Sequence, residues 1–114
     1  MSRDDVVNAI KLSSVFARDA SNVIKMIVDK KKGLEIESQS QRMGSQKSEV
    51  EGRINGEITD NLEIGFNYKY VEDFLSACKS ESILVELIDE SSPGIFRDPK
   101  DNSYLHIIMP LKLN

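Results

Sequence analysis

Hydrophobic positions near the start of the chain recur at intervals of three and four residues, which is the period of an amphipathic helix. Ser2 is a suitable N-cap, and Asp4 and Asp5 place negative charge in the first turn. The pattern therefore predicts a helix from Ser2 to Ala20. Its apolar face comprises Val6, Ala9, Ile10, Ser13, Phe16, Ala17 and Ala20, and its opposite face Asn8, Lys11, Ser14, Val15 and Arg18.

The period changes to two after Ser21-Asn22. Alternating and β-branched residues predict strands over 23–29, 34–40 and 45–54. The first two are joined by the turn 30–33 into a hairpin. Asn55-Gly56 is a turn dipeptide, although Glu57-Ile58 could instead prolong the third strand.

A second helix is expected in the other half of the chain. A short strand over 62–66 leads into a helix over 67–79 with Asn67 as its N-cap. Three further strands are predicted over 83–88, 95–97 and 104–113. The helix should bury Tyr70, Val71, Phe74, Ala77 and Cys78, and should expose Lys69, Glu72, Asp73, Ser76 and Lys79.

The two halves of this string match if one strand is missing before the first helix. We therefore expect an α+β domain with a duplicated βαβββ unit, in which two helices pack on an antiparallel sheet layer. The first copy would lack its opening strand. Such a sheet should carry an unpaired edge that a partner or a second copy of the chain could occupy.

Composition is that of one globular domain, with 114 residues, 39% hydrophobic and 30% charged. The net charge of -4 disfavours tight, non-specific binding of nucleic acid by this chain alone. Apolar runs are far shorter than the roughly 20 residues of a membrane helix. The N-terminus has no signal-peptide core, so we expect a soluble, cytoplasmic protein.

Catalytic chemistry is hard to assemble from these residues. His106 is the only histidine and Cys78 the only cysteine, and both fit structural positions in a strand and on a buried helix face. Glu49 and Glu51 read as solvated neighbours. We find no metal-ligand spacing and no phosphate-binding glycine loop, so we expect no catalytic residue, no metal and no cofactor.

The C-terminus is unusual because it stays apolar to its penultimate residue, Leu113. Chain ends are ordinarily polar and frayed. Residues 107–113 therefore either close the core or form one wall of a groove for a partner peptide, and the sequence pattern leaves both possibilities open.

Two motifs in the second half resemble a known family. Residues 64–75 have the pattern I-G-F-N-x-x-Y-x-x-D-x-L, and residues 109–113 have the pattern M-P-x-K-L. Together with the segment 87–94, and with the first helix, they resemble the C-terminal third of the bacterial DNA polymerase III beta subunit, the sliding clamp. The resemblance covers essentially the whole chain.

The resemblance implies a non-catalytic processivity factor. In that family, two chains of three similar domains form a ring around duplex DNA, which tethers DNA polymerase III and other replication and repair proteins. The chain would be a fragment, 1–114, of the third domain that lacks the first two domains. Helix residues facing the DNA would be Lys11, Arg18, Lys69 and Lys79, and the ring interface would include Glu49 and Glu51.

The resemblance also implies a cleft that binds short Gln-plus-Leu/Phe peptide motifs between the second and third domains. With half of that cleft outside this chain, its peptide affinity should be far below that of an intact clamp. An alternative function is a free-standing protein-protein interaction module without a DNA ring. The third-domain share of the cleft would be Tyr70, Ser91, Pro93, Ile107, Met109, Pro110, Leu111 and Lys112.

Overall fold

A computed structural model describes residues 1–29, 33–52 and 62–113, which form two helices and seven strands. The order agrees with the predicted α-β-β-β, β-α-β-β-β string. The elements are α1 (Arg3–Ala17), β1 (Val23–Asp29), β2 (Gly33–Ser40), β3 (Gly44–Val50), β4 (Leu62–Asn67), α2 (Tyr68–Ala77), β5 (Leu84–Glu86), β6 (Gly94–Asp98) and β7 (Asp101–Ile108).

Several boundaries differ from the predicted ones. Helix α1 ends at Ala17 because Ser21 and Asn22, with φ of 59° and 62°, turn the chain through the left-handed region. Strand β5 is shorter than predicted, and β7 begins at Asp101 and ends at Ile108 rather than at 113. Strand β3 ends at Val50, before the predicted end at residue 54. The predicted turn residues 30–32 and 55–56 lie outside the described residues.

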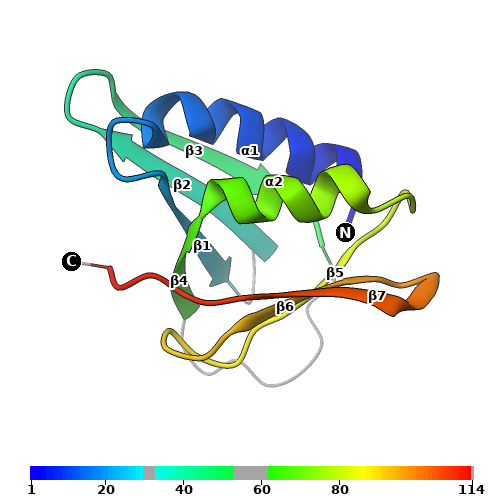
Figure 1. Cartoon of the computed structure of the whole chain (residues 1–114). Helices are drawn as coiled ribbons and strands as arrows, with labels where there is room; N and C mark the ends of the chain where they lie inside the picture. The colour runs from blue at the N-terminus through cyan, green and yellow to red at the C-terminus, as the bar shows by residue number, and fades with distance from the viewer. Residues whose placement is uncertain (30–32, 53–61, 114) are drawn as a thin grey trace.

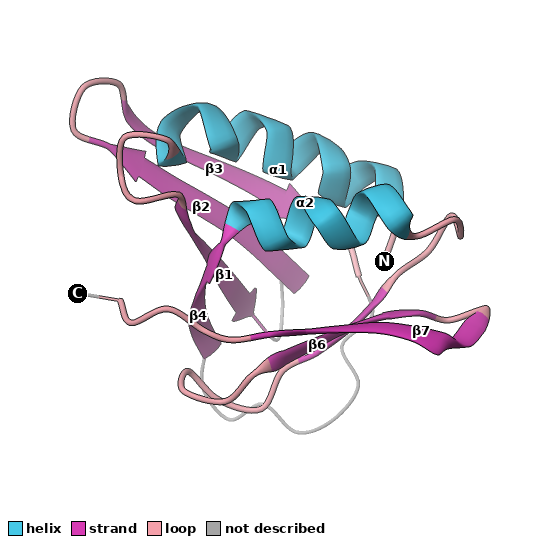
Figure 2. Ribbon diagram, in the orientation of Figure 1, coloured by secondary structure: helices cyan, strands magenta, loops and turns pink. Residues whose placement is uncertain are grey.

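All paired strands are antiparallel and form two sheets, with the orders β3-β2-β1-β4 and β5-β6-β7. The two helices run side by side, α1 against β2 and β3 and α2 beside β7 (Figure 1). Figure 2 shows the helices on one side of this sheet layer. Strand β3 is an edge of its sheet among the described residues, as predicted.

The duplication is visible in how the two units begin. Strand β4, which opens the second unit, pairs with β1. At the corresponding place in the first unit, Ser2 forms a bridge with Ser82 just before β5. The main-chain N–H of Ile83 donates to the carbonyl of Met1 at 2.8 Å. The residues that lead into α1 therefore occupy the position of an opening strand.

The core lies between the helices and the inner faces of both sheets. Phe66 and Phe96 meet edge to face, with ring centroids 5.6 Å apart, and join the two sheets. Phe74 of α2 contacts the same Phe96 ring. The side chain of Ser38 donates a hydrogen bond to the main chain of Ser13, which fixes α1 on β2.

Both helices bury a slightly different face from the one predicted. Ser14 of α1 is buried, whereas the helical periodicity placed it on the exposed face. On α2 the buried residues include Tyr68 and Leu75, while Tyr70 and Ala77 are exposed. The cause is that α2 packs against both α1 and β7, so its buried face follows the two neighbouring elements and not the simplest apolar stripe.

Candidate functional site

Tyr70 stands on the exposed side of the first turn of α2. Asn67 begins this helix because its side-chain oxygen accepts a hydrogen bond of 2.9 Å from the main-chain N–H of Lys69. Strand β4 thus runs directly into α2 and fixes the direction of the helix start. The Tyr70 side chain is 58% exposed, so its amphipathic ring is presented to solvent at the start of the helix.

The C-terminal tail, residues 109–113, lies next to the strand that leads to Tyr70. Beyond β7 the chain turns away from its sheet, and the main-chain N–H of Leu111 donates a hydrogen bond of 2.7 Å to the carbonyl of Gly65 in β4. In Figure 1 the red tail crosses the green strand β4, which leads upward into α2. The tail therefore neither frays nor enters the core.

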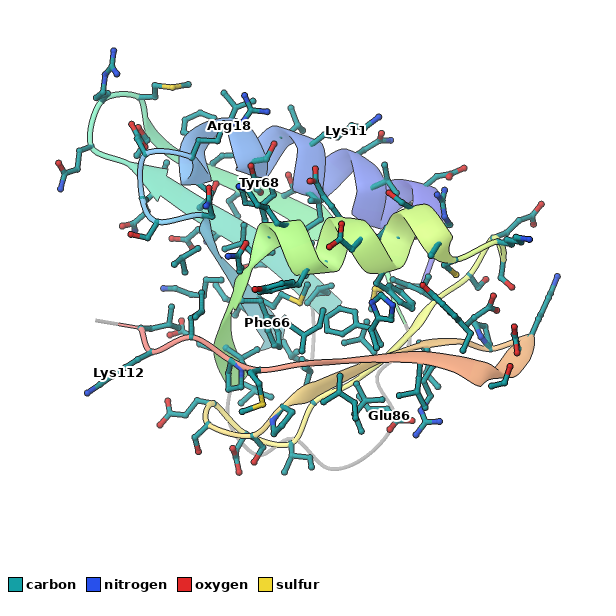
Figure 3. The ribbon with its side chains drawn as sticks, in the orientation of Figure 1. Lys11, Arg18, Phe66, Tyr68, Glu86 and Lys112 are labelled. Atoms are coloured by element: carbon teal, nitrogen blue, oxygen red, sulfur yellow. The ribbon has the colours of Figure 1, made fainter. Side chains whose placement is uncertain are left out.

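The apolar side chains of this region face solvent. Ile107 and Met109 are 62% and 65% exposed, and Leu111 is 36% exposed. Pro110 is half-buried and Lys112 is exposed; Figure 3 shows Lys112 at the far end of the tail, pointing away from the protein. Exposed apolar side chains grouped in this way are typical of an interaction surface.

Ser91 and Pro93 lie in the loop between β5 and β6. The main-chain N–H of Ser91 donates to the Asp89 carboxylate at 2.9 Å, which orders the loop as an Asx turn. Hydrogen bonds from Ser92 and Ser91 hold the pKa of Asp89 below its ordinary value. Pro93 is half-buried directly before Gly94, which pairs with Ile108 at the end of β7.

The structure therefore brings the tail against β4 and places the loop between β5 and β6 beside the end of β7.

One residue that the sequence pattern did not single out is Gly65. A Cβ atom built on it would lie 2.7 Å from a methyl carbon of Leu113 and 2.9 Å from the carbonyl oxygen of Leu111. The available signal was an isolated glycine inside a strand, which marks a close approach of another backbone.

The four predicted DNA-facing residues are all exposed, but they belong to different parts of the helix layer. Lys11 and Arg18 lie on α1, Lys69 lies in the first turn of α2, and Lys79 follows the end of α2. Figure 3 shows Lys11 and Arg18 on the side of α1 that faces away from the β5-β7 sheet. Between them, Leu12 and Val15 also face solvent.

The two predicted interface glutamates lie at the β3 edge. Glu49 is exposed within β3, and Glu51 is exposed just beyond the end of that strand. On the neighbouring strand the Glu35 carboxylate forms an ion pair of 3.6 Å with Lys47 of β3. This edge therefore carries charges of both signs.

The residues with potential catalytic chemistry occupy structural positions. Burial raises the pKa of the Cys78 thiol, so little nucleophilic thiolate forms. The Ser80 hydroxyl donates to the buried Asp98 carboxylate. His106 packs on the Phe74 ring and meets the Tyr104 hydroxyl at 3.1 Å. Among the described residues we find no group of three His, Cys, Asp or Glu side chains that could hold a metal ion.

A hollow of about 440 Å³ is lined mainly by residues of β1, β2 and β4. Its lining includes Leu113 and the charged side chains of Lys25, Glu37 and Glu63, but none of the eight predicted cleft residues. Carboxylates make a poor surface for an apolar peptide motif, so the tail and the start of α2 remain the candidate site.

Comparison with known proteins shows the family to which the chain belongs. Residues 1–112 match the model of the family described as DNA polymerase III beta subunit, C-terminal domain. The chain belongs to this family. It is 31% identical, over 108 residues, to the beta sliding clamp of Staphylococcus epidermidis; the match covers 95% of this chain and 28% of that protein.

Solved clamp structures share the fold. The crystal structure of the DNA polymerase III beta subunit of Thermotoga maritima is 30% identical and superposes with a TM-score of 0.91, covering 100% of this chain and 30% of that one. A sliding clamp from Pseudomonas aeruginosa bound to griselimycin is 23% identical with a TM-score of 0.85, covering 99% and 30%. The predicted α+β clamp-domain fold is confirmed.

This clamp-family chain thus spans under a third of the length of the relatives it matches. Neither of its two described helices is long and apolar enough to cross a membrane.

Proposed function

We propose that this chain serves as the third domain of a bacterial sliding clamp, residues 1–114, in a protein whose first two domains lie outside these residues. The clamp would act in DNA replication as a non-catalytic processivity subunit of DNA polymerase III. A closed ring tethers the polymerase by raising its effective concentration at the template. The site of action would be the cytoplasm, at replication forks.

Weak contact with DNA is part of this proposal. Lys11 and Arg18 on α1, with Lys69 and Lys79 on and after α2, would face the duplex inside the ring. All four are exposed, and none forms an ion pair among the described residues. A few cations on an otherwise acidic chain would attract the phosphates only loosely, which permits sliding.

Ring closure would use the β3 edge, with Glu49 and Glu51 facing a basic first domain of the second chain. The support is that β3 is an edge strand and that both carboxylates are exposed. In the full-length protein, Glu49→Lys together with Glu51→Lys should convert dimers to monomers in sedimentation velocity. A dimer of unchanged affinity would contradict this interface.

Peptide capture would take place at the tail. We infer that Tyr70, Ser91, Pro93, Ile107, Met109, Pro110, Leu111 and Lys112 form this domain's share of a cleft for the apolar motifs of DNA polymerase III and other replication and repair proteins. The observation that carries this proposal is that Met109 and Tyr70 stay largely exposed while the tail is hydrogen-bonded to β4. The binding of griselimycin by the Pseudomonas clamp accords with a ligand site on the fold.

The cleft is tested by titrating a fluorescent peptide with a Gln-plus-Leu/Phe motif against this chain. We expect weak binding, because only one wall of the cleft is present, and loss of binding in Met109→Ala. Leu12→Ala removes an apolar side chain from α1 that is also more than half exposed, and serves as the control. Equal binding by both variants, or the affinity of an intact clamp, would contradict the proposal.

A further inference from the structure

The tail that carries Met109 is held at two points, one on each sheet. On one side, Ile108 pairs with Gly94 at the end of β7 and is buried. On the other side, the Leu111 N–H bonds to the Gly65 carbonyl of β4. Only Met109 and Pro110 span the gap, so the direction of the Met109 side chain depends on where these two anchors lie.

Pro110 makes this short span stiff. Its ring fixes its own φ, and it disfavours helical conformations for Met109, which precedes it. Because proline has no N–H, Pro110 itself has no main-chain donor that needs a partner. A displacement of the Leu111 anchor is therefore transmitted to Met109 and not absorbed between them.

The second anchor lies directly on Gly65, which has no side chain. The tail lies so close to β4 that a Cβ atom at this position would be 2.7 Å from Leu113 Cδ2 and 2.9 Å from the Leu111 carbonyl oxygen. Both distances are shorter than the contacts that Cβ atoms make in real proteins. The Leu113 side chain can move aside, but the Leu111 carbonyl belongs to the hydrogen-bonded backbone and can shift only with the tail.

We propose that Gly65 is a positioning residue for the peptide cleft: its missing side chain seats residues 111–113 on β4 and thereby holds Met109 and Leu111 where a partner's motif can meet them. This inference rests on the proposed function of the tail. It adds a residue that touches no peptide itself and acts through the tail alone.

The test uses Gly65→Ala in this chain, with two readouts. The first needs no peptide: we expect the Leu111 amide to exchange its hydrogen at least about tenfold faster, as a locally released segment does, while amides of α1 keep their protection. The second is the fluorescent-peptide titration, in which we expect about tenfold weaker binding, the loss typical of a site whose supporting contacts have loosened.

Two further variants separate positioning from general destabilisation. Gly65→Ala combined with Leu113→Ala removes the side chain that can move aside but leaves the Leu111 carbonyl oxygen 2.9 Å from the new methyl group, so we expect it to keep the faster exchange and the weaker peptide binding of Gly65→Ala. Gly44→Ala strains a turn at φ of 97°, has open space around its Cβ and lies far from the tail in sequence. We expect it to lower stability without changing the Leu111 amide or peptide binding.

The outcomes are distinct. Unchanged Leu111 exchange in Gly65→Ala would overturn the proposal, as would faster exchange with unaltered peptide affinity. If the unsubstituted chain binds no peptide, the proposed function of the tail is wrong, and the claim that Gly65 positions a cleft falls with it. The exchange readout would still show in that case whether Gly65 seats the tail.

Discussion

The buried hydroxyl of Ser38 donates a hydrogen bond of 2.8 Å to the main-chain carbonyl of Ser13, which holds β2 against the C-terminal half of α1. The Ser13 hydroxyl itself is buried and has no hydrogen-bond partner among the described residues. The two serine hydroxyls thus affect the stability of the fold in opposite ways, because a buried polar group stabilises a protein only when it has a hydrogen-bond partner.

We therefore expect Ser38→Ala to lower the free energy of unfolding by about 1 kcal/mol, the usual net value of such a bond. Ser13→Ala should leave the stability unchanged or raise it, since it removes an unpaired hydroxyl from the core. Urea denaturation of the two variants and the parent chain measures both effects. A larger loss in Ser13→Ala than in Ser38→Ala would show that these roles are reversed.

A second prediction concerns the thiol of Cys78, which is 3% exposed. Burial, assisted by the nearby Asp98 charge, raises its pKa above the ordinary value. We expect a thiol reagent at pH 8 to react with the native chain at least about tenfold more slowly than with the denatured chain.

The matched control introduces an accessible thiol on the same helix. Ser76 is exposed on α2, so the Ser76→Cys variant should show one fast and one slow thiol in mass spectrometry. Equally fast labelling of both would mean that the end of α2 opens readily in the native state.

The Asp98 carboxylate predicts how stability depends on acid pH. The Ser80 hydroxyl, followed by the Lys100 N–H at 2.9 Å, lowers its pKa below the ordinary 3.8. A group whose pKa is lower in the folded state stabilises the fold above its unfolded pKa. That contribution disappears as the pH falls from 3.8 through the lower, folded value.

Unfolding free energy should therefore fall between pH 5 and pH 2, and the fall should be smaller in Asp98→Asn. Asp73→Asn, which alters an exposed carboxylate on α2, controls for the general loss of negative charge. Urea titrations at several pH values give the slopes. Parallel slopes for Asp98→Asn and the parent chain would refute the assignment.

Much of the fold was predictable because its elements carry local periodic signals. The caps at Ser2 and Asn67 both form as predicted, and their side chains accept main-chain hydrogen bonds in the first helical turns. The end of α1 was predicted wrongly. Nothing in a hydrophobic pattern reveals that Ser21 and Asn22 adopt left-handed backbone conformations.

The candidate site was less accessible to sequence reasoning. The exposure of Met109 follows from where the tail goes after β7, and that path depends on a contact with Gly65 in a distant strand. Local patterns left open whether the tail closed the core. Tyr70 was placed both on the buried stripe and in the cleft; the packing of α2 on two neighbours excludes the first position.

The helix layer gives the last prediction, on DNA. Because the chain carries a net charge of -4 and its cations are sparse, we expect it to bind duplex DNA more weakly than about 100 µM at physiological salt. At low salt, weak binding to DNA should appear as screening falls.

Lys11→Glu with Arg18→Glu should abolish this binding, since both side chains are exposed on one side of α1. Lys112→Glu reverses one exposed charge at the tail and should retain most of the binding. Fluorescence anisotropy of labelled duplex DNA, measured against salt concentration, gives the affinity of the parent chain and of both variants. Tight binding that is insensitive to salt would contradict a clamp that holds DNA by encirclement, because such a contact would stop the ring from sliding.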